Sequence, residues 1–233
     1  MNTRRTLIAS IMLAGGLVSA TAHAALQSRL GGQAVYDTDL NVTWLANANL
    51  AATDTFGVTG ISAGGRMFWP TAQNWIAAMN AADYLGHNDW MLPTTLQPDS
   101  SCFDQGGGSW GLDCTGSQMG HLFYSELGGV AGSSITSTHN ASYSLFSNIQ
   151  AWSYWSGTVY APDPTQAWLF SMGGGMQFWN FQTGSGSEYA WAVLPGDVAT
   201  TFPTPEADTW AMMAVGLGLI GAVARRKSVK GWG

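Results

Sequence analysis

The chain has 233 residues, of which 46% are hydrophobic and only 9% are charged. Residues 25–208 hold fourteen acidic side chains but only two basic ones, Arg29 and Arg66, which leaves a formal charge of −12 in that region. Such a surface repels nucleic acid and anionic lipid, so nucleic-acid binding is excluded, and it attracts cations.

Residues 1–24 have the three parts of a secretory signal peptide. Arg4 and Arg5 precede an uncharged run at residues 6–20, and Ala22-His23-Ala24 forms an A-x-A cleavage site. An N-terminal membrane anchor is the alternative, disfavoured because the run is short. We therefore expect signal peptidase to remove this segment and the rest of the chain to fold outside the cytoplasm, with residues 25–198 as one domain.

The first half of this domain is predicted to contain two short strands, a turn-rich loop and a helix, at residues 34–36, 42–45, 47–65 and 70–85. Trp75, Met79 and Ala82 fall on one face of the helix, and Gly86 provides a stop signal. Ten of the twelve tryptophans lie between residues 25 and 208, and most of them are expected in the core.

The turn between the two strands carries the first three ligand positions of a calcium loop, Asp37, Asp39 and Asn41. Position six should be glycine but is Val42, and no glutamate follows at position twelve. An Asx-rich hairpin turn is the favoured interpretation. We expect no cofactor, with calcium as the alternative that lacks a full motif.

Cys102 and Cys114 are the only cysteines, and in an oxidising compartment we expect a disulfide between them rather than a metal site. The loop of this size contributes about 3 kcal/mol in the chain-entropy model. Inside it, residues 107–111 match G-x-S-x-G, but a nucleophile elbow needs a strand before it and a helix after it. The three histidines of the domain, His87, His121 and His139, form no zinc motif. We therefore expect no enzyme and no metal ligand.

The second half of the domain is predicted to hold a helix at 117–127 and then four strands, at residues 151–160, 167–172, 176–182 and 189–194. The glycines at 173–175 are expected to form a hairpin between two of these strands. Helices early in the chain and an antiparallel meander late in it indicate an α+β fold.

Four segments follow the order of motifs in the Lcl C-terminal domain family, namely Asp37…Leu40…Trp44, Asp89-Trp90-Met91-Leu92-Pro93-Thr94, Tyr154-Trp155-Ser156 and Val193-Leu194-Pro195-Gly196. The chain resembles this family over most of residues 33–197, and the resemblance implies a single C-type-lectin-like domain. Met91 and Leu194 stand where the family usually has arginine, so a polar network built on those cations is not expected here. Motifs of this kind predict the fold better than the function.

Trp179-Asn180-Phe181 resembles the Trp-Asn-Asp element of C-type lectins without its Asp, so calcium-dependent sugar binding by that route is not expected. A flat aromatic and amide surface for a glycan is the remaining hypothesis, and its candidate residues are Trp155, Asp163, Gln166, Trp179 and Asn180. The alternative is that these tryptophans simply fill the core.

The C-terminal end of the chain is a linker at 199–208, an uncharged run at 209–224 and a basic tail at 225–233. The run is predicted to be a short transmembrane helix with its tail in the cytoplasm. At ~1.5 Å per residue it spans ~24 Å, less than the ~30 Å hydrocarbon core.

This arrangement resembles a PEP-CTERM sorting signal, through residues Pro205, Glu206, Ala207, Arg225, Arg226 and Lys227. Ala207 replaces the second proline of the family's motif. The resemblance implies processing by exosortase in a Gram-negative bacterium that secretes exopolysaccharide. A permanent single-span anchor is the alternative.

Together these features predict an exported protein that passes through an inner-membrane intermediate, held by its C-terminal helix, to the cell surface or the extracellular matrix. We expect it to bind exopolysaccharide or a surface protein without catalysis. Two alternatives stay open: a secreted polysaccharide hydrolase with paired carboxylates, and a purely structural matrix protein.

Overall fold

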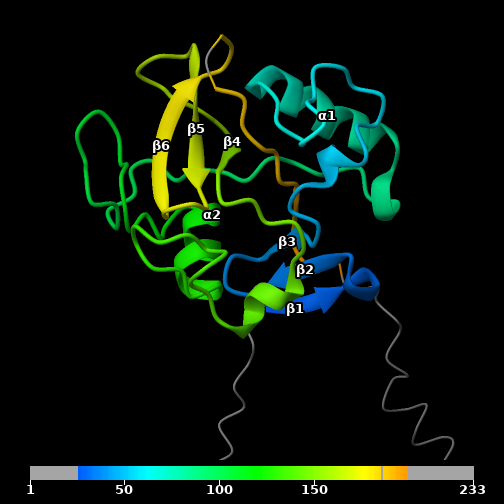
Figure 1. The fold of residues 1–233 in the computed structure, drawn as a ribbon, viewed down its shortest axis with the longest axis horizontal. Coiled ribbons are helices and arrows are strands. Elements are labelled where there is room, and N and C mark those ends of the chain that lie inside the picture. The colour runs from blue at the N-terminus through cyan, green and yellow to red at the C-terminus, as the bar shows by residue number, and fades with distance from the viewer. Residues whose placement is uncertain (1–25, 185, 199–233) are drawn as a thin grey trace, which may run out of the picture.

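The computed structural model describes residues 26–184 and 186–198, which form a mixed α+β fold with two antiparallel sheets (Figure 1). The first sheet has the order β1-β2-β3-β7, with strands Leu26–Arg29, Ala34–Asp37, Val42–Leu45 and Val193–Pro195. The second has the order β4-β5-β6, with strands Ser153–Val159, Gln166–Ser171 and Met176–Phe181. The helices are α1, Trp69–Ala81, and α2, Gln118–His121, which continues as a π-helical turn, Leu122–Glu126. Short 3-10 turns occupy Leu30–Gly32, Leu50–Ala52, Tyr84–Gly86 and Ala141–Leu145.

The first sheet joins the two ends of the domain. The predicted strands at 34–36 and 42–45 are confirmed as β2 and β3, and the turn between them is an Asx turn, because Asp37 Oδ1 accepts hydrogen bonds from the amides of Asp39 and Leu40. Strand β7 pairs with β3 and not with the late meander, as Trp44 lies opposite Val193. The predicted strand at 189–194 was therefore too long and in the wrong sheet. Its residues 190–194 are all buried, a pattern from which no pairing partner can be deduced.

The second sheet is the predicted meander. Ser171 and Met176 are partners across the hairpin that contains the three glycines. Trp168 of β5 faces Trp179 of β6, so the two rings lie on the same side of the sheet. A bulge interrupts β4 between Trp155 and Val159.

Both predicted helices exist, with different ends. Helix α1 stops at Ala81, because Asp83 and Leu85 have left-handed backbones with φ of 50° and 58° that cannot continue it. Trp75 and Met79 are buried as predicted, whereas Ala82 is exposed. The second helix keeps α-helical geometry for only one turn.

Most tryptophans lie in the core, as predicted: six of the ten in the described residues are fully buried, namely Trp44, Trp75, Trp90, Trp155, Trp168 and Trp191. Trp155 and Trp191 donate their indole N–H to the carbonyls of Met67 and Leu45, which satisfies a polar group that would otherwise be costly to bury.

The signal peptide at 1–24, most of the linker at 199–208, the helix at 209–224 and the tail at 225–233 lie outside the described residues. Within residues 26–184 and 186–198, no helix has the length and apolar character that a membrane crossing requires.

Candidate functional site

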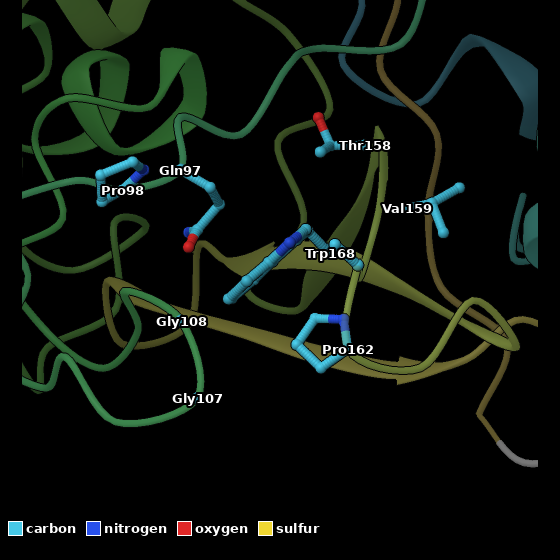
Figure 2. A pocket seen from close by; sticks show the side chains of 9 residues that line it. Gln97, Pro98, Gly107, Gly108, Thr158, Val159, Pro162 and Trp168 are labelled. Carbon is cyan, nitrogen blue, oxygen red and sulfur yellow. The ribbon is translucent and has the colours of Figure 1, made fainter.

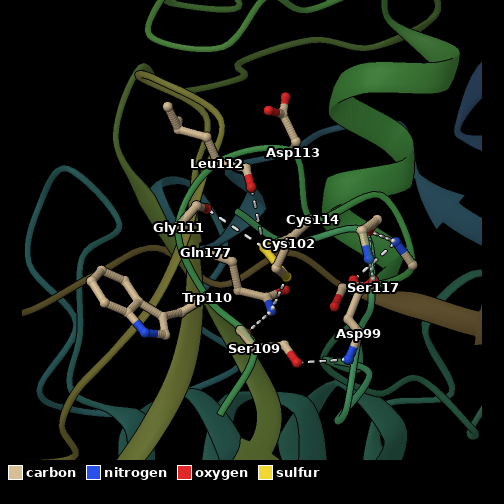
Figure 3. Close-up of a disulfide and its surroundings, with 12 residues drawn as sticks. Asp99, Cys102, Ser109, Trp110, Gly111, Leu112, Asp113, Cys114, Ser117 and Gln177 are labelled. Atoms are coloured by element: carbon tan, nitrogen blue, oxygen red, sulfur yellow. Dashed lines mark hydrogen bonds between the residues drawn. A yellow bond between two sulfur atoms is a disulfide. The ribbon is translucent and has the colours of Figure 1, made fainter. Parts of the chain in front are cut away.

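The disulfide loop, residues 102–114, lies against the edge of the second sheet (Figure 3). The predicted bond between Cys102 and Cys114 is present. Gly111 and Gln177 of β6 exchange two backbone hydrogen bonds of 2.8 Å, and the Gln177 side chain donates to the Ser109 carbonyl at 2.8 Å. The loop is thus held to β6 by both backbone and side-chain hydrogen bonds.

Ser109, the central residue of the G-x-S-x-G match, is a structural residue of this loop. Its side chain is buried. The hydroxyl donates a hydrogen bond to Gln105 Oε1 and accepts one from the Asp99 amide, each 2.8 Å long. The residues before it form turns, so the segment lacks the strand-to-helix geometry of a nucleophile elbow.

Four aromatic rings meet where the loop covers β5 and β6; we name Trp110, Tyr160, Trp168 and Trp179 the aromatic cluster. Tyr160 stacks on Trp179, with ring centroids 4.3 Å apart, and Trp168 stands edge-on to both rings at 5.3 Å. Trp110 packs edge-on against Trp179 at 5.7 Å. The Tyr160 hydroxyl donates to the Gly107 carbonyl, which ties the cluster to the disulfide loop.

A pocket of about 400 Å³ opens beside the cluster (Figure 2). Its walls come from four segments: the 97–98 stretch, the disulfide loop, the end of β4 with the following turn, and β5. The lining residues are Gln97, Pro98, Gly107, Gly108, Thr158, Val159, Ala161, Pro162 and Trp168. In Figure 2 the Trp168 ring lies between Gln97 and Pro162, and because Trp168 is only 2% exposed it closes the floor of the pocket.

The polar groups of the pocket hold its walls together. The Gln97 amide makes two 2.8 Å hydrogen bonds to the backbone of Ser109, so it fastens the disulfide loop. Thr158 accepts a hydrogen bond from the Thr95 amide with its hydroxyl oxygen, and the same hydroxyl can still donate to a ligand. The pocket therefore combines a mostly apolar wall with a few polar groups, the usual composition of a small-molecule site.

The predicted ligand residues have different places. Trp155 is fully buried, which excludes it from a surface and corrects that prediction. Gln166 and Trp179 share one face of the second sheet, together with Phe181, which is 49% exposed. Asn180 points to the opposite face, since side chains alternate along a strand.

Asp163 caps the turn between β4 and β5. Its carboxylate accepts hydrogen bonds from the side chains of Gln166 and Thr165 and from the Thr165 amide. These bonds, that of Gln166 foremost, lower the pKa of Asp163. Its oxygens are thus engaged in the local turn.

A second apolar hollow, of about 460 Å³, lies near the β5–β6 hairpin. Trp152, which is 51% exposed, and Met176 are among its lining residues, and the Arg66 guanidinium lies 5.2 Å from the centroid of a Trp152 ring. It is the competing surface in any binding experiment.

The sequence did not indicate that Trp110, Tyr160 and Gln97 belong to the site. Alternation along β5 could have placed Trp168, but only the folded loop shows which residues cover it. In the part of the chain that the structure describes, one group of three side chains has the arrangement of metal ligands, Asp37, His121 and Glu126. It is built on β2, α2 and the π-helical turn, and therefore on other elements than the pocket.

The fold and the C-terminal motif together define an exported, sorted domain protein. The PEP-CTERM protein-sorting motif matches residues 203–227, and such a motif marks a protein for processing by exosortase through a membrane-anchored intermediate. The Lcl C-terminal domain matches residues 33–194, and the chain belongs to this family. Both resemblances seen in the sequence are thereby confirmed. No curated protein and no solved structure matches the chain.

Proposed function

We propose that this protein is a non-catalytic, glycan-binding protein of the cell surface or extracellular matrix, and that its Lcl domain is related in fold to C-type lectins. Its ligand is a neutral glycan, held in the pocket beside the aromatic cluster. Exosortase processing delivers the domain to the compartment where exopolysaccharide is found.

The observation that carries the proposal is the pocket beside the aromatic cluster. A sugar ring has an apolar face of C–H groups and a rim of hydroxyls. Pro98, Val159 and Pro162 are exposed and offer the apolar wall that such a face requires, above the buried edge of Trp168. The Thr158 hydroxyl and the peptide groups of the disulfide loop offer hydrogen bonds to the rim. Because four rings and a disulfide loop already hold the pocket wall in place, little conformational entropy is lost when a ligand binds.

Charge selects the class of glycan. The described residues carry two arginines against twelve acidic side chains, so the surface repels uronic acids and sulfated sugars. Arg29 forms an ion pair with Asp197, with 2.6 Å between Nε and Oδ1, and Arg66 Nε donates a hydrogen bond to the Ser187 carbonyl. Neutral polysaccharide is therefore the favoured ligand.

Binding of the mature protein to exopolysaccharide from the producing bacterium, separated into neutral and uronic fractions, tests this function. Ala161 is exposed and lines the pocket, so Ala161→Trp should fill the pocket without disturbing the core. Ala141→Trp places the same ring on an exposed residue of the 3-10 turn at Ala141–Leu145 as the matched control.

We expect binding to the neutral fraction that weakens at least tenfold in Ala161→Trp and is unchanged in Ala141→Trp. Absence of binding to the neutral fraction, or equal binding by both variants, would contradict the proposal.

A further inference from the structure

Three potential ligands converge where the first sheet meets α2. Asp37 is the last residue of β2, His121 the last residue of α2, and Glu126 the last residue of the π-helical turn. One ligand atom from each lies within 4.8 Å of the other two, and His121 Nε2 is 3.2 Å from Glu126 Oε1. Asp37 is far from the other two in the sequence, and His121 and Glu126 are five residues apart, so together they match no metal-binding sequence motif.

The π-helical turn is what brings two of them together. Residues five apart point about 140° away from each other in a regular α-helix, so His121 and Glu126 would diverge. Here Leu127 N donates to Leu122 O at 2.9 Å, five residues back, which is the hydrogen bond of a π-helix. Such turns are rare and occur often at functional sites.

Asp37 supplies an independent observation. Its side chain is 0% exposed, and Oδ1 accepts the two amide bonds of the Asx turn. Oδ2 is buried without a hydrogen-bond partner in the described residues. The Trp44 indole lies close enough to lower the pKa of Asp37, but its Nε1 does not reach the geometry of a hydrogen bond. A buried carboxylate oxygen left in this way is costly unless something binds it.

The cluster is also short of positive charge. Burial raises the pKa of Glu126, and the charge of Asp37 raises it further, which His121 only partly offsets. Burial likewise raises the pKa of Asp37. Asp39 adds a further negative charge nearby. The two arginines of the described region are engaged elsewhere, with Asp197 and with Ser187.

We propose that Asp37, His121 and Glu126 bind one divalent cation of the zinc class. An imidazole beside two carboxylates suits first-row transition metals better than calcium or magnesium, which prefer oxygen alone. Zinc ligands in a tetrahedron stand about 3.4 Å apart, so the 3.2 Å pair fits and the third ligand needs only a small movement. The cation ties the β2–β3 hairpin to α2, and the His121 side chain, which is 18% exposed, leaves a route for its entry.

The test uses untagged mature protein stripped with a chelator and titrated calorimetrically with zinc chloride, and in parallel with calcium chloride. His121→Gln removes the imidazole, and Glu126→Gln removes a charge while keeping the shape. His139→Gln is the matched control, because His139 is exposed and stacks on Tyr143 instead.

We expect one equivalent of zinc, a zinc-dependent rise in Tm, and calcium affinity at least tenfold lower. Zinc affinity should fall at least tenfold in His121→Gln and Glu126→Gln and stay unchanged in His139→Gln. No zinc uptake by the wild type, uptake that survives in both ligand variants, or uptake lost in His139→Gln would overturn the proposal. If one ligand variant fails to fold, the other decides.

Discussion

Trp179 lies flat against Tyr160, with ring centroids 4.3 Å apart and an angle of 3° between the ring planes. This stacked pair links β6 to the end of β4, and the Tyr160 hydroxyl carries the link on to Gly107 of the disulfide loop. Three segments that are separate in the sequence thus share one rigid contact. The stability of the pocket wall and its shape should therefore depend on the same ring.

Trp179→Ala removes this ring. Because Trp179 is only half-buried, we expect a loss of about 2–3 kcal/mol in the free energy of unfolding, less than the 3–5 kcal/mol typical of a fully buried tryptophan. Trp179→Phe keeps a ring for Tyr160 to contact and should lose clearly less. Urea unfolding of the two variants measures both values. Equal losses would show that ring stacking does not hold the wall.

Gly108 has a φ of 128°, and a Cβ there would come within 3.1 Å of the Trp168 ring and 3.3 Å of the Gln97 amide oxygen. Gly108→Ala should therefore lower stability by about 1–3 kcal/mol and weaken glycan binding. Gly64 has an ordinary backbone and open space around it, so Gly64→Ala is the control and should change stability by less than about 1 kcal/mol. Thermal unfolding of both variants would reveal whether the loop tolerates a side chain at Gly108, which would contradict the close contact.

Glu188 is a buried carboxyl away from the pocket. Burial raises its pKa above the ordinary 4.5, although a hydrogen bond from Trp152 and the charge of Arg66 act in the opposite direction. A raised pKa in the folded state means that folding favours the protonated form. The stabilisation is complete below about pH 4.5 and is lost as the pH rises through the folded-state pKa.

Glu188→Gln mimics the protonated form at every pH. Its stability relative to the wild type should therefore improve as the pH rises from 4.5 to 8, in urea unfolding at several pH values. Asp89→Asn, at an exposed carboxylate, is the control for the loss of one negative charge. A stability difference that does not depend on pH would contradict the raised pKa.

Sorting makes a prediction of its own for the mature chain. Signal peptidase should remove residues 1–24, and exosortase should cut near Pro205-Glu206-Ala207, within the matched motif. Intact-mass spectrometry of protein from cells and medium should find a chain that starts at Ala25 and lacks residues 209–233. A species that retains those residues in the medium would contradict processing by exosortase.

The sequence predicted the features that depend on residues close together in the chain. The Asp/Asn turn indicated the two strands beside it, β2 and β3, while alternation and turn glycines indicated the meander. Two cysteines in an exported chain indicated their disulfide. The end of α1 was missed because left-handed residues such as Asp83 and Leu85 have no signature of their own. The pairing of β7 with β3 was missed because Trp44 and Val193 lie about 150 residues apart.

The candidate site shows the same difference between local patterns, which the sequence reveals, and contacts between distant segments, which it does not. Trp179 and Gln166 were predicted as surface candidates and share a sheet face, whereas Trp155 proved to be core. Whether a tryptophan on a strand faces the core or a ligand depends on what packs over it. In this protein the disulfide loop packs over Trp179 and places Trp110 against it. The sequence of the loop does not show where the loop will pack.

The most direct measurement is a crystal structure of the mature protein with neutral oligosaccharides released from the producer's exopolysaccharide. We predict a sugar ring in the pocket, packed against Pro98 and Pro162 and within hydrogen-bonding distance of Thr158. A sugar bound instead in the hollow beside Trp152 and Met176, or no sugar at saturating concentrations, would contradict it.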